Sequence, residues 1–138
     1  MVITSRLSLQ TKGYGDMIDI TGAVAEQVSG SGVKDGTVTV FIPGATAGVT
    51  TIEYESGLVA DFHNLWERLA PQQDPYEHDR RWGDGNGFSH VRSALLGASL
   101  AVPFCNRKLT LGTWQQIVLI DFDNRPRSRQ VVLQIMGE

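Results

Sequence analysis

Short stretches of apolar residues, several of them alternating with polar ones, predict that much of the chain forms β-strands. We expect strands at residues 2–11, 35–44, 47–55, 98–104, 108–122 and 127–137. The linker at residues 43–48 is short, so the second and third of these strands could pair as a hairpin.

Three segments instead have apolar residues at helical spacing, and they lie between the predicted strands. They are residues 20–32, 56–71 and 88–97. Thr21 and Ser89 are residue types that cap helix N-termini, so we expect them to begin the first and third helices. Glycines end the first and third helices, and a proline ends the second.

A long glycine- and proline-containing stretch, residues 71–87, is predicted to be a loop. Strands dominate the pattern and helices are inserted between them. The predicted class is therefore α+β with a largely antiparallel sheet. No internal repeat or interdomain linker is present in the sequence, so residues 1–138 are expected to form a single domain.

One predicted strand is apolar on both faces, because residues 117–120 are Ile, Val, Leu and Ile in succession. A strand with one face in water alternates apolar and polar side chains instead. Two explanations remain open at this point. Helices of the same chain cover both faces, or a neighbouring subunit covers one of them.

Composition narrows the classes of function. The chain has 138 residues, 41% of them hydrophobic and 20% charged, with a net charge of −3. This charge argues against a nucleic-acid partner. The first residues contain no continuous apolar run, so we expect no membrane segment and a cytoplasmic location. A single cysteine excludes an internal disulfide and a cysteine-based zinc site.

Residues 76–92 concentrate the side chains that could carry chemistry, including His78, Asp84, His90 and Arg92. A histidine at the start of a helix lies in a positive field and tends to stay neutral, so it can bind a metal or act as a base. The two histidines are separated by a spacing that matches no zinc motif. The plain alternative is a solvent-exposed polar loop.

Two other positions are candidates on the predicted third strand and just before it. Glu53 near the strand's end could serve as a ligand or general base, and the alternative is a solvated strand end. Thr46 precedes the strand and adds a hydroxyl group, although threonine is common in strands for structural reasons.

Several segments together resemble the YjbQ-like family of small bacterial and archaeal proteins. They are "TKGYGDMIDIT", "PYEHD", "DGNGFSHVRSALLGASLAVPF" and "LTLGTWQQIVLIDFDNRPRSRQVVLQIMGE". The resemblance implies antiparallel sheets forming a barrel-like body with inserted helices, and assembly as a homotrimer. Some members are described as having a secondary thiamine-phosphate synthase activity, which joins a thiazole phosphate to a pyrimidine pyrophosphate.

The resemblance also implies site residues, which match the family's pattern at His78, His90, Asp84, Asn86, Thr46 and Glu53. Two positions depart from it. Gly44 and Phe88 stand where relatives often have histidine. If the family's site is a three-histidine metal centre, this chain retains only His78 and His90 as histidine ligands. Restoring histidine at Phe88 should tighten zinc binding, provided that residues 88 and 90 face the same pocket.

Two functions follow as expectations. The first is a weak thiamine-phosphate synthase, in which His90, His78 and Arg92 act on the substrate and Asp84, Asn86, Thr46 and Glu53 bind it. A divalent metal, zinc or magnesium, would assist the pyrophosphate leaving group. The alternative is a non-catalytic trimeric protein that binds a metal or a small phosphorylated molecule.

Overall fold

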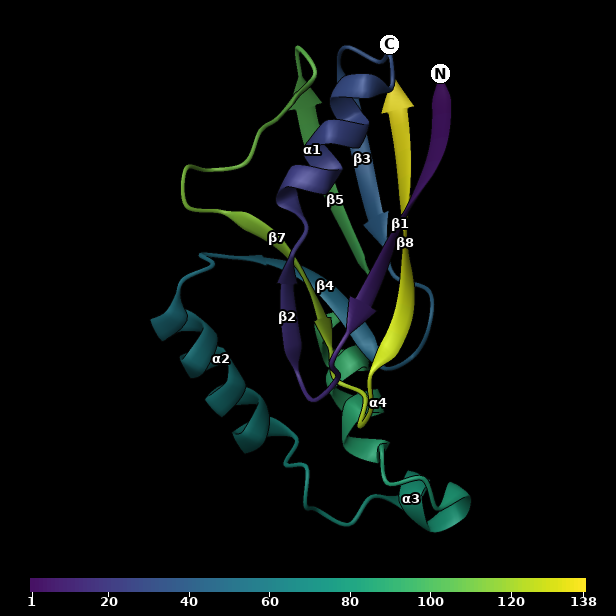
Figure 1. The fold of residues 1–138 in the computed structure, drawn as a ribbon, viewed down its shortest axis with the longest axis vertical. Coiled ribbons are helices and arrows are strands. Elements are labelled where there is room, and N and C mark those ends of the chain that lie inside the picture. The colour runs from purple at the N-terminus through teal and green to yellow at the C-terminus, as the bar shows by residue number, and fades with distance from the viewer.

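The computed structural model describes residues 1–138 and shows an α+β fold in which antiparallel sheets curl around a core, as predicted (Figure 1). The strands are β1 (Val2–Thr11), β2 (Asp16–Asp19), β3 (Gly36–Phe41), β4 (Ala47–Ile52), β5 (Ser99–Cys105), β6 (Lys108–Leu109), β7 (Gln116–Asp121) and β8 (Arg127–Gly137). The helices are α1 (Thr21–Gly30), α2 (Ser56–Leu69), α3 (Glu77–Trp82) and α4 (Gly87–Leu96). Five strands form one sheet in the order β1-β8-β3-β5-β6, and three form another in the order β2-β7-β4.

The predicted hairpin between β3 and β4 is wrong, because the two strands lie in different sheets. β3 is hydrogen-bonded to β5 on one edge and to β8 on the other. No edge of β3 is left for β4, which pairs antiparallel with β7 instead. The chain between them crosses from one sheet to the other, and Gly44 takes a φ of 119° there.

Three short elements differ from the sequence prediction. Residues 16–19, for which no strand was predicted, form β2 against β7. Residues 77–82, expected as loop, form α3. The single strand predicted over residues 108–122 is divided into β6 and β7, because a turn closed by Gly112 N–H donating to Gln115 Oε1 interrupts it.

The helix caps also differ. Thr21 is the first residue of α1, and Ile20 occupies the N-cap position without a side-chain bond. The Thr21 hydroxyl instead donates to Asp19 and accepts from Ile117 N–H, which ties the start of α1 to β7. Asn86, not Ser89, is the N-cap of α4.

Both faces of β7 are buried within the chain. Ile117 and Leu119 belong to the larger core cluster, which lies between the two sheets. Val118 and Ile120 pack in a second cluster with Trp66 of α2. One face is therefore covered by a helix and the other by the five-stranded sheet. The apolar pattern of this strand requires no neighbouring subunit.

The arrangement gives the molecule two distinct ends. Both termini lie at one end with α1, while α3 and α4 lie at the other (Figure 1). None of the helices combines the length and apolar content that crossing a membrane requires.

Candidate functional site

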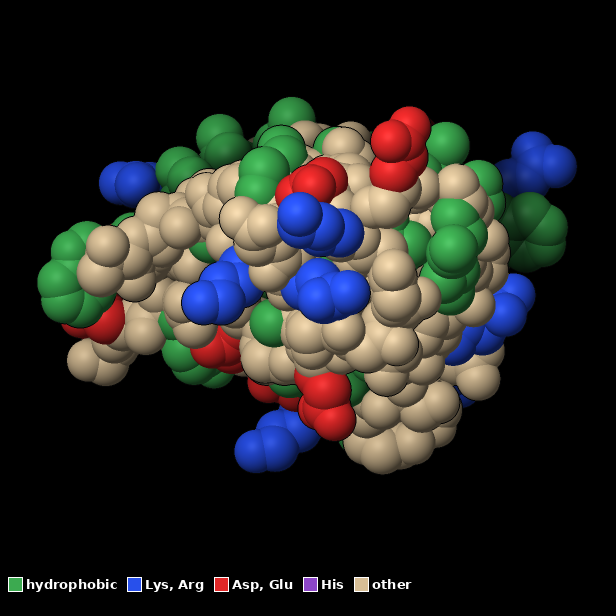
Figure 2. Space-filling view, turned by 90° about the horizontal axis from the view of Figure 1, so that it is seen from above, with side chains coloured by type: hydrophobic (Ala, Val, Ile, Leu, Met, Phe, Trp, Pro, Cys, Tyr) green, Lys and Arg blue, Asp and Glu red, His purple; other side chains and the backbone are tan.

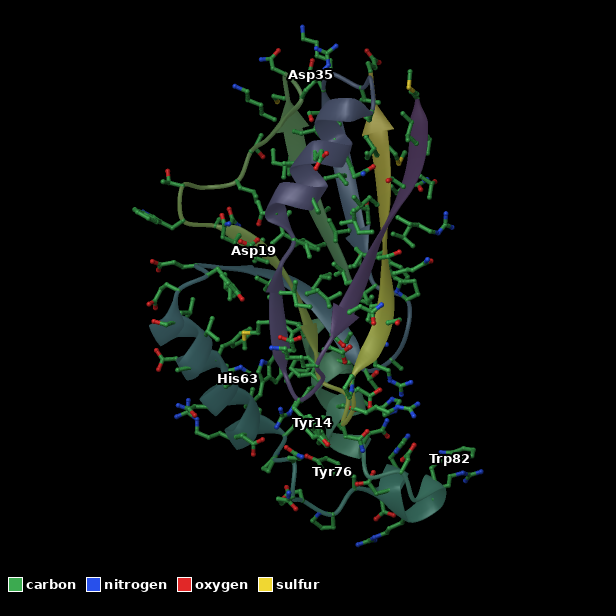
Figure 3. The ribbon with its side chains drawn as sticks, in the orientation of Figure 1. Tyr14, Asp19, Asp35, His63, Tyr76 and Trp82 are labelled. Atoms are coloured by element: carbon green, nitrogen blue, oxygen red, sulfur yellow. The ribbon has the colours of Figure 1, made fainter.

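The two histidines predicted as site residues meet at the α3–α4 end of the molecule. Their ring centroids are 4.3 Å apart, and the ring planes are inclined by 34°. The turn between the helices makes this approach possible, because Gly83 and Gly85 both take a φ of 71°, in the left-handed region. Figure 3 shows Tyr76 just before α3 and Trp82 at the far end of that helix.

Two carboxylates flank the His78 ring. Its Nδ1 atom lies 3.4 Å from Asp84 Oδ1 and 3.6 Å from Asp79 Oδ1. Neither contact is a hydrogen bond, so this buried nitrogen has no partner in the protein. The three side chains offer ligand atoms that all lie within 4.8 Å of one another. Asp79 was not among the predicted residues, and its Oδ1 also accepts from Gly87 N–H.

The surroundings of His90 favour the neutral form of its imidazole. Burial lowers the pKa of its imidazole below the usual 6.5, and the neighbouring His78 lowers it further. The carboxylates of Asp123, Asp84 and Asp79 oppose this change without reversing it. A neutral imidazole has a nitrogen lone pair available for a metal or a proton.

A group of buried ion pairs lies at the end of β7 and was not predicted. Asp121 and Asp123 are fully buried. Arg129 of β8 donates from Nε to Asp121 at 2.8 Å, and Arg127 donates from Nε to Asp123 at 2.7 Å. The sequence contained a signal for these buried carboxylates, because Asp121 and Asp123 directly follow the apolar run at residues 117–120.

Thr46 and Asn86, both predicted as ligand-binding residues, join these ion pairs. Asn86 Nδ2 and Thr46 Oγ1 each lie 3.2 Å from a carboxylate oxygen of Asp123, and Thr46 Oγ1 accepts from Arg129 Nη2 at 2.6 Å. Burial by itself would raise the pKa of Asp123, but hydrogen bonds from Asn86, Asn124 N–H and Arg127 hold it below its usual value. The Oδ1 atom of Asn86 is buried without a partner.

Arg92, predicted to act on a substrate, points into the interior of the protein. Its side chain is buried, donating from Nε to the carbonyl of Ala70 at 3.0 Å and from Nη2 to Glu67 at 2.7 Å. The guanidinium also lies 5.0 Å from the centre of the Phe88 ring. Arg92 therefore fastens α4 to the end of α2, and its charge is already neutralised.

Glu53 is separated from the histidines. It is exposed just beyond the end of β4, whereas Thr46 lies just before its start. Because a strand rises about 3.3 Å per residue, Glu53 and Thr46 are roughly 20 Å apart. Glu53 lines a small cavity with Tyr54 and Trp114, whereas His90 lines a different one.

The two departures from the family's pattern have different consequences. Gly44 and His90 line the same cavity of about 390 Å³, and a Cβ atom at position 44 would lie 3.1 Å from Arg129 Nη1. Phe88 is only 1% exposed and packs in the interior on α4. Residues two apart on a helix point about 200° away from each other, so position 88 does not face the cavity that His90 lines.

We therefore expect Phe88→His not to tighten zinc binding, which corrects the expectation drawn from sequence alone. The substitution should instead lower thermal stability, because it places a polar ring among apolar neighbours. Zinc titration together with thermal unfolding checks both effects. A clearly tighter zinc complex with unchanged stability would contradict the helical geometry at this position.

Comparisons with known proteins agree with the fold. Residues 5–138 match the family described as UPF0047 protein YjbQ-like. A UPF0047 protein of Archaeoglobus fulgidus is 38% identical over 130 residues, which cover 94% of this chain and 98% of the relative. The crystal structure of a protein of unknown function from Sulfolobus solfataricus has a TM-score of 0.94 and 29% identity, with 100% of this chain and 99% of that chain covered.

A second solved structure, an uncharacterized conserved protein from Clostridium acetobutylicum, is 35% identical with a TM-score of 0.87 and covers 96% of this chain and 99% of its own. These likenesses extend over almost the whole length of each protein. They confirm the resemblance found in the sequence motifs. The chain belongs to the YjbQ-like, or UPF0047, family, whose function is uncharacterised.

Proposed function

We propose that the α3–α4 end of the protein binds a divalent metal ion through His78 and His90, with Asp84 beside them. The close approach of the two imidazole rings carries this proposal. The unpartnered Nδ1 atom of His78 and its neighbouring carboxylates add to it. Zinc binds well to three or four ligands, and two imidazoles with one carboxylate and water reach that number.

The proposed ligand of this site is a small phosphorylated molecule. Arg127 and Arg129 are paired with buried aspartates, and Arg92 is paired with Glu67. These arginines therefore contribute little free positive charge toward a phosphate. A divalent ion on the histidines would supply that charge, as metal ions do in many phosphate sites.

Thiamine-phosphate synthase activity is the second candidate, and we expect it to be weak. The neutral His90 favours it, since such an imidazole can accept a proton near pH 7. Arg92 and Glu53, which were expected to help, lie outside the histidine cluster. The site is better suited to holding a ligand than to stabilising the charge of a departing pyrophosphate.

Homotrimeric assembly is part of this proposal and rests on the family resemblance. The two-sided apolar strand no longer supports it, because both faces of β7 are covered within the chain. Sedimentation of the purified protein, with and without zinc, measures the assembly directly, and a trimer is the expected species.

The metal proposal is tested by calorimetric titration of zinc and magnesium into the wild-type protein and His90→Ala. We expect the substitution to weaken zinc binding by at least about tenfold, since it removes one of two imidazole ligands. His63→Ala is the matched control, because it removes the third histidine, on α2. Equal zinc affinity in wild type and His90→Ala would rule out the site.

Zinc affinity should fall as the solution becomes acidic, because a protonated imidazole cannot bind a metal. Burial lowers the pKa of His90 from the usual histidine value, so His90 stays neutral to lower pH than an exposed histidine does. The same titrations repeated between pH 5 and 8 measure this dependence.

A further inference from the structure

A groove of about 530 Å³ lies at the end of the molecule opposite the histidines, between α1 and the segment that contains β6 and the start of β7. In Figure 3, Asp35 marks this end, and Tyr76 and Trp82 mark the other. Figure 2 views this end from above and shows Lys and Arg side chains gathered near its middle. The groove is lined by Thr21, Ala25, Glu26, Ser29, Arg107, Lys108, Leu109, Leu111, Gly112, Gln115 and Gln116.

The neutral polar side chains of the groove are largely occupied by bonds within the protein. Each already donates a hydrogen bond: Thr21 to Asp19, Ser29 to the carbonyl of Glu26, Gln115 to Thr51 and Gln116 to Asp19. The side chains of Arg107 and Lys108 make no hydrogen bond and have no carboxylate within ion-pair distance. The strongest free donors of the groove are therefore two cations.

The backbone at Arg107 adopts a left-handed conformation. Asn106 and Arg107 form the two-residue turn between β5 and β6, with φ of 51° and 63°. Both values lie in the left-handed region, as in the turn type that prefers asparagine followed by glycine. Arginine at the second position is less favourable for the turn than glycine, so the turn itself gives no reason for this side chain.

We propose that this groove binds a small organic anion. A phosphate or carboxylate group of the ligand contacts Arg107 and Lys108, and its apolar part packs on Ala25, Leu109 and Leu111. The volume is within the range of small-molecule sites. Glu26 on the wall carries the opposite charge, so it disfavours a second anionic group on the ligand. The groove shares no residue with the proposed metal site at the other end.

The test uses amide NMR spectra of the full chain, titrated to millimolar concentration with phenyl phosphate and, separately, with benzoate. The two probes distinguish a phosphate head group from a carboxylate. We expect saturable shifts at the amides of residues 107–109 and along the facing side of α1. Phenol, which lacks the charge, should cause none that saturate.

Arg107→Gly is the decisive variant, because glycine suits the turn and the protein should remain folded with an unchanged or higher melting temperature. It should weaken binding of the anionic probe by about tenfold, the effect of one charge-assisted contact. Lys12→Ala removes an exposed cation from the opposite end and should leave affinity unchanged, as should His90→Ala. Lys108→Ala should weaken binding as Arg107→Gly does.

Absence of saturable shifts with both probes would overturn the proposal. So would equal affinity in wild type and Arg107→Gly, or shifts that concentrate around the histidines. A change in sedimentation of Arg107→Gly without any effect on probe binding would show that the groove contacts a second copy instead, and this result also overturns it.

Discussion

Replacing Asp121 with alanine should lower the free energy of unfolding by about 3–5 kcal/mol, the usual effect of breaking a buried ion pair. Asp121 is fully buried, and the Arg129 side chain that it pairs with is only 11% exposed. The carboxylate also accepts from Thr11 Oγ1 at 2.6 Å. The substitution would leave a buried guanidinium without its partner and would loosen β1, β7 and β8 where they meet. Urea unfolding followed by circular dichroism measures the loss.

Asp74→Ala is the control for this experiment, since Asp74 is exposed and makes no ion pair. We expect it to change stability by less than about 0.5 kcal/mol. Asp121→Asn should fall between the two, because the amide keeps an acceptor but loses the charge. If Asp121→Ala costs less than about 1 kcal/mol, water reaches Arg129 and the ion pairs are not buried as described.

The second large effect concerns β7. Leu119→Ala and Ile120→Ala should each lower the free energy of unfolding by about 2–5 kcal/mol, because each removes a fully buried side chain from a packed core. The two residues belong to different core clusters on opposite faces of the strand. Urea unfolding at several protein concentrations measures both losses, which should not depend on concentration, because both faces are covered within one chain.

Leu95→Ala provides the matched control, because Leu95 is 61% exposed on α4. Leu95→Ala should lower the free energy of unfolding only slightly. A large effect of Leu119→Ala with a negligible effect of Ile120→Ala would mean that α2 does not pack firmly on the outer face. Losses that grow as the protein is diluted would instead assign part of the cover to another subunit.

Much of the fold could be predicted from sequence because the main strands and helices have clear periodicity. The pairing of strands was harder to foresee. A short linker made a hairpin of residues 36–41 and 47–52 reasonable, yet both edges of β3 are taken by strands distant in sequence. α3 escaped prediction because it is short and buries no residue, so it has no apolar periodicity to detect.

The candidate site was predictable only in part. The position of His78 and His90 in one polar stretch indicated a site, but their contact depends on a turn with two left-handed glycines. The burial of Arg92 was missed, although its spacing contained a signal for it. It lies four residues after Phe88, so both side chains occupy one face of α4, and that face is buried.

The most direct test of the proposed metal site is a nitrogen-15 NMR spectrum of the imidazole rings, recorded while zinc is added. Zinc bound to a ring nitrogen changes the chemical shift of that nitrogen in a characteristic way. The account predicts this change for one nitrogen of His78 and one of His90, in the same titration step, with His63 unaffected. A spectrum in which saturating zinc leaves His78 and His90 unchanged would contradict it.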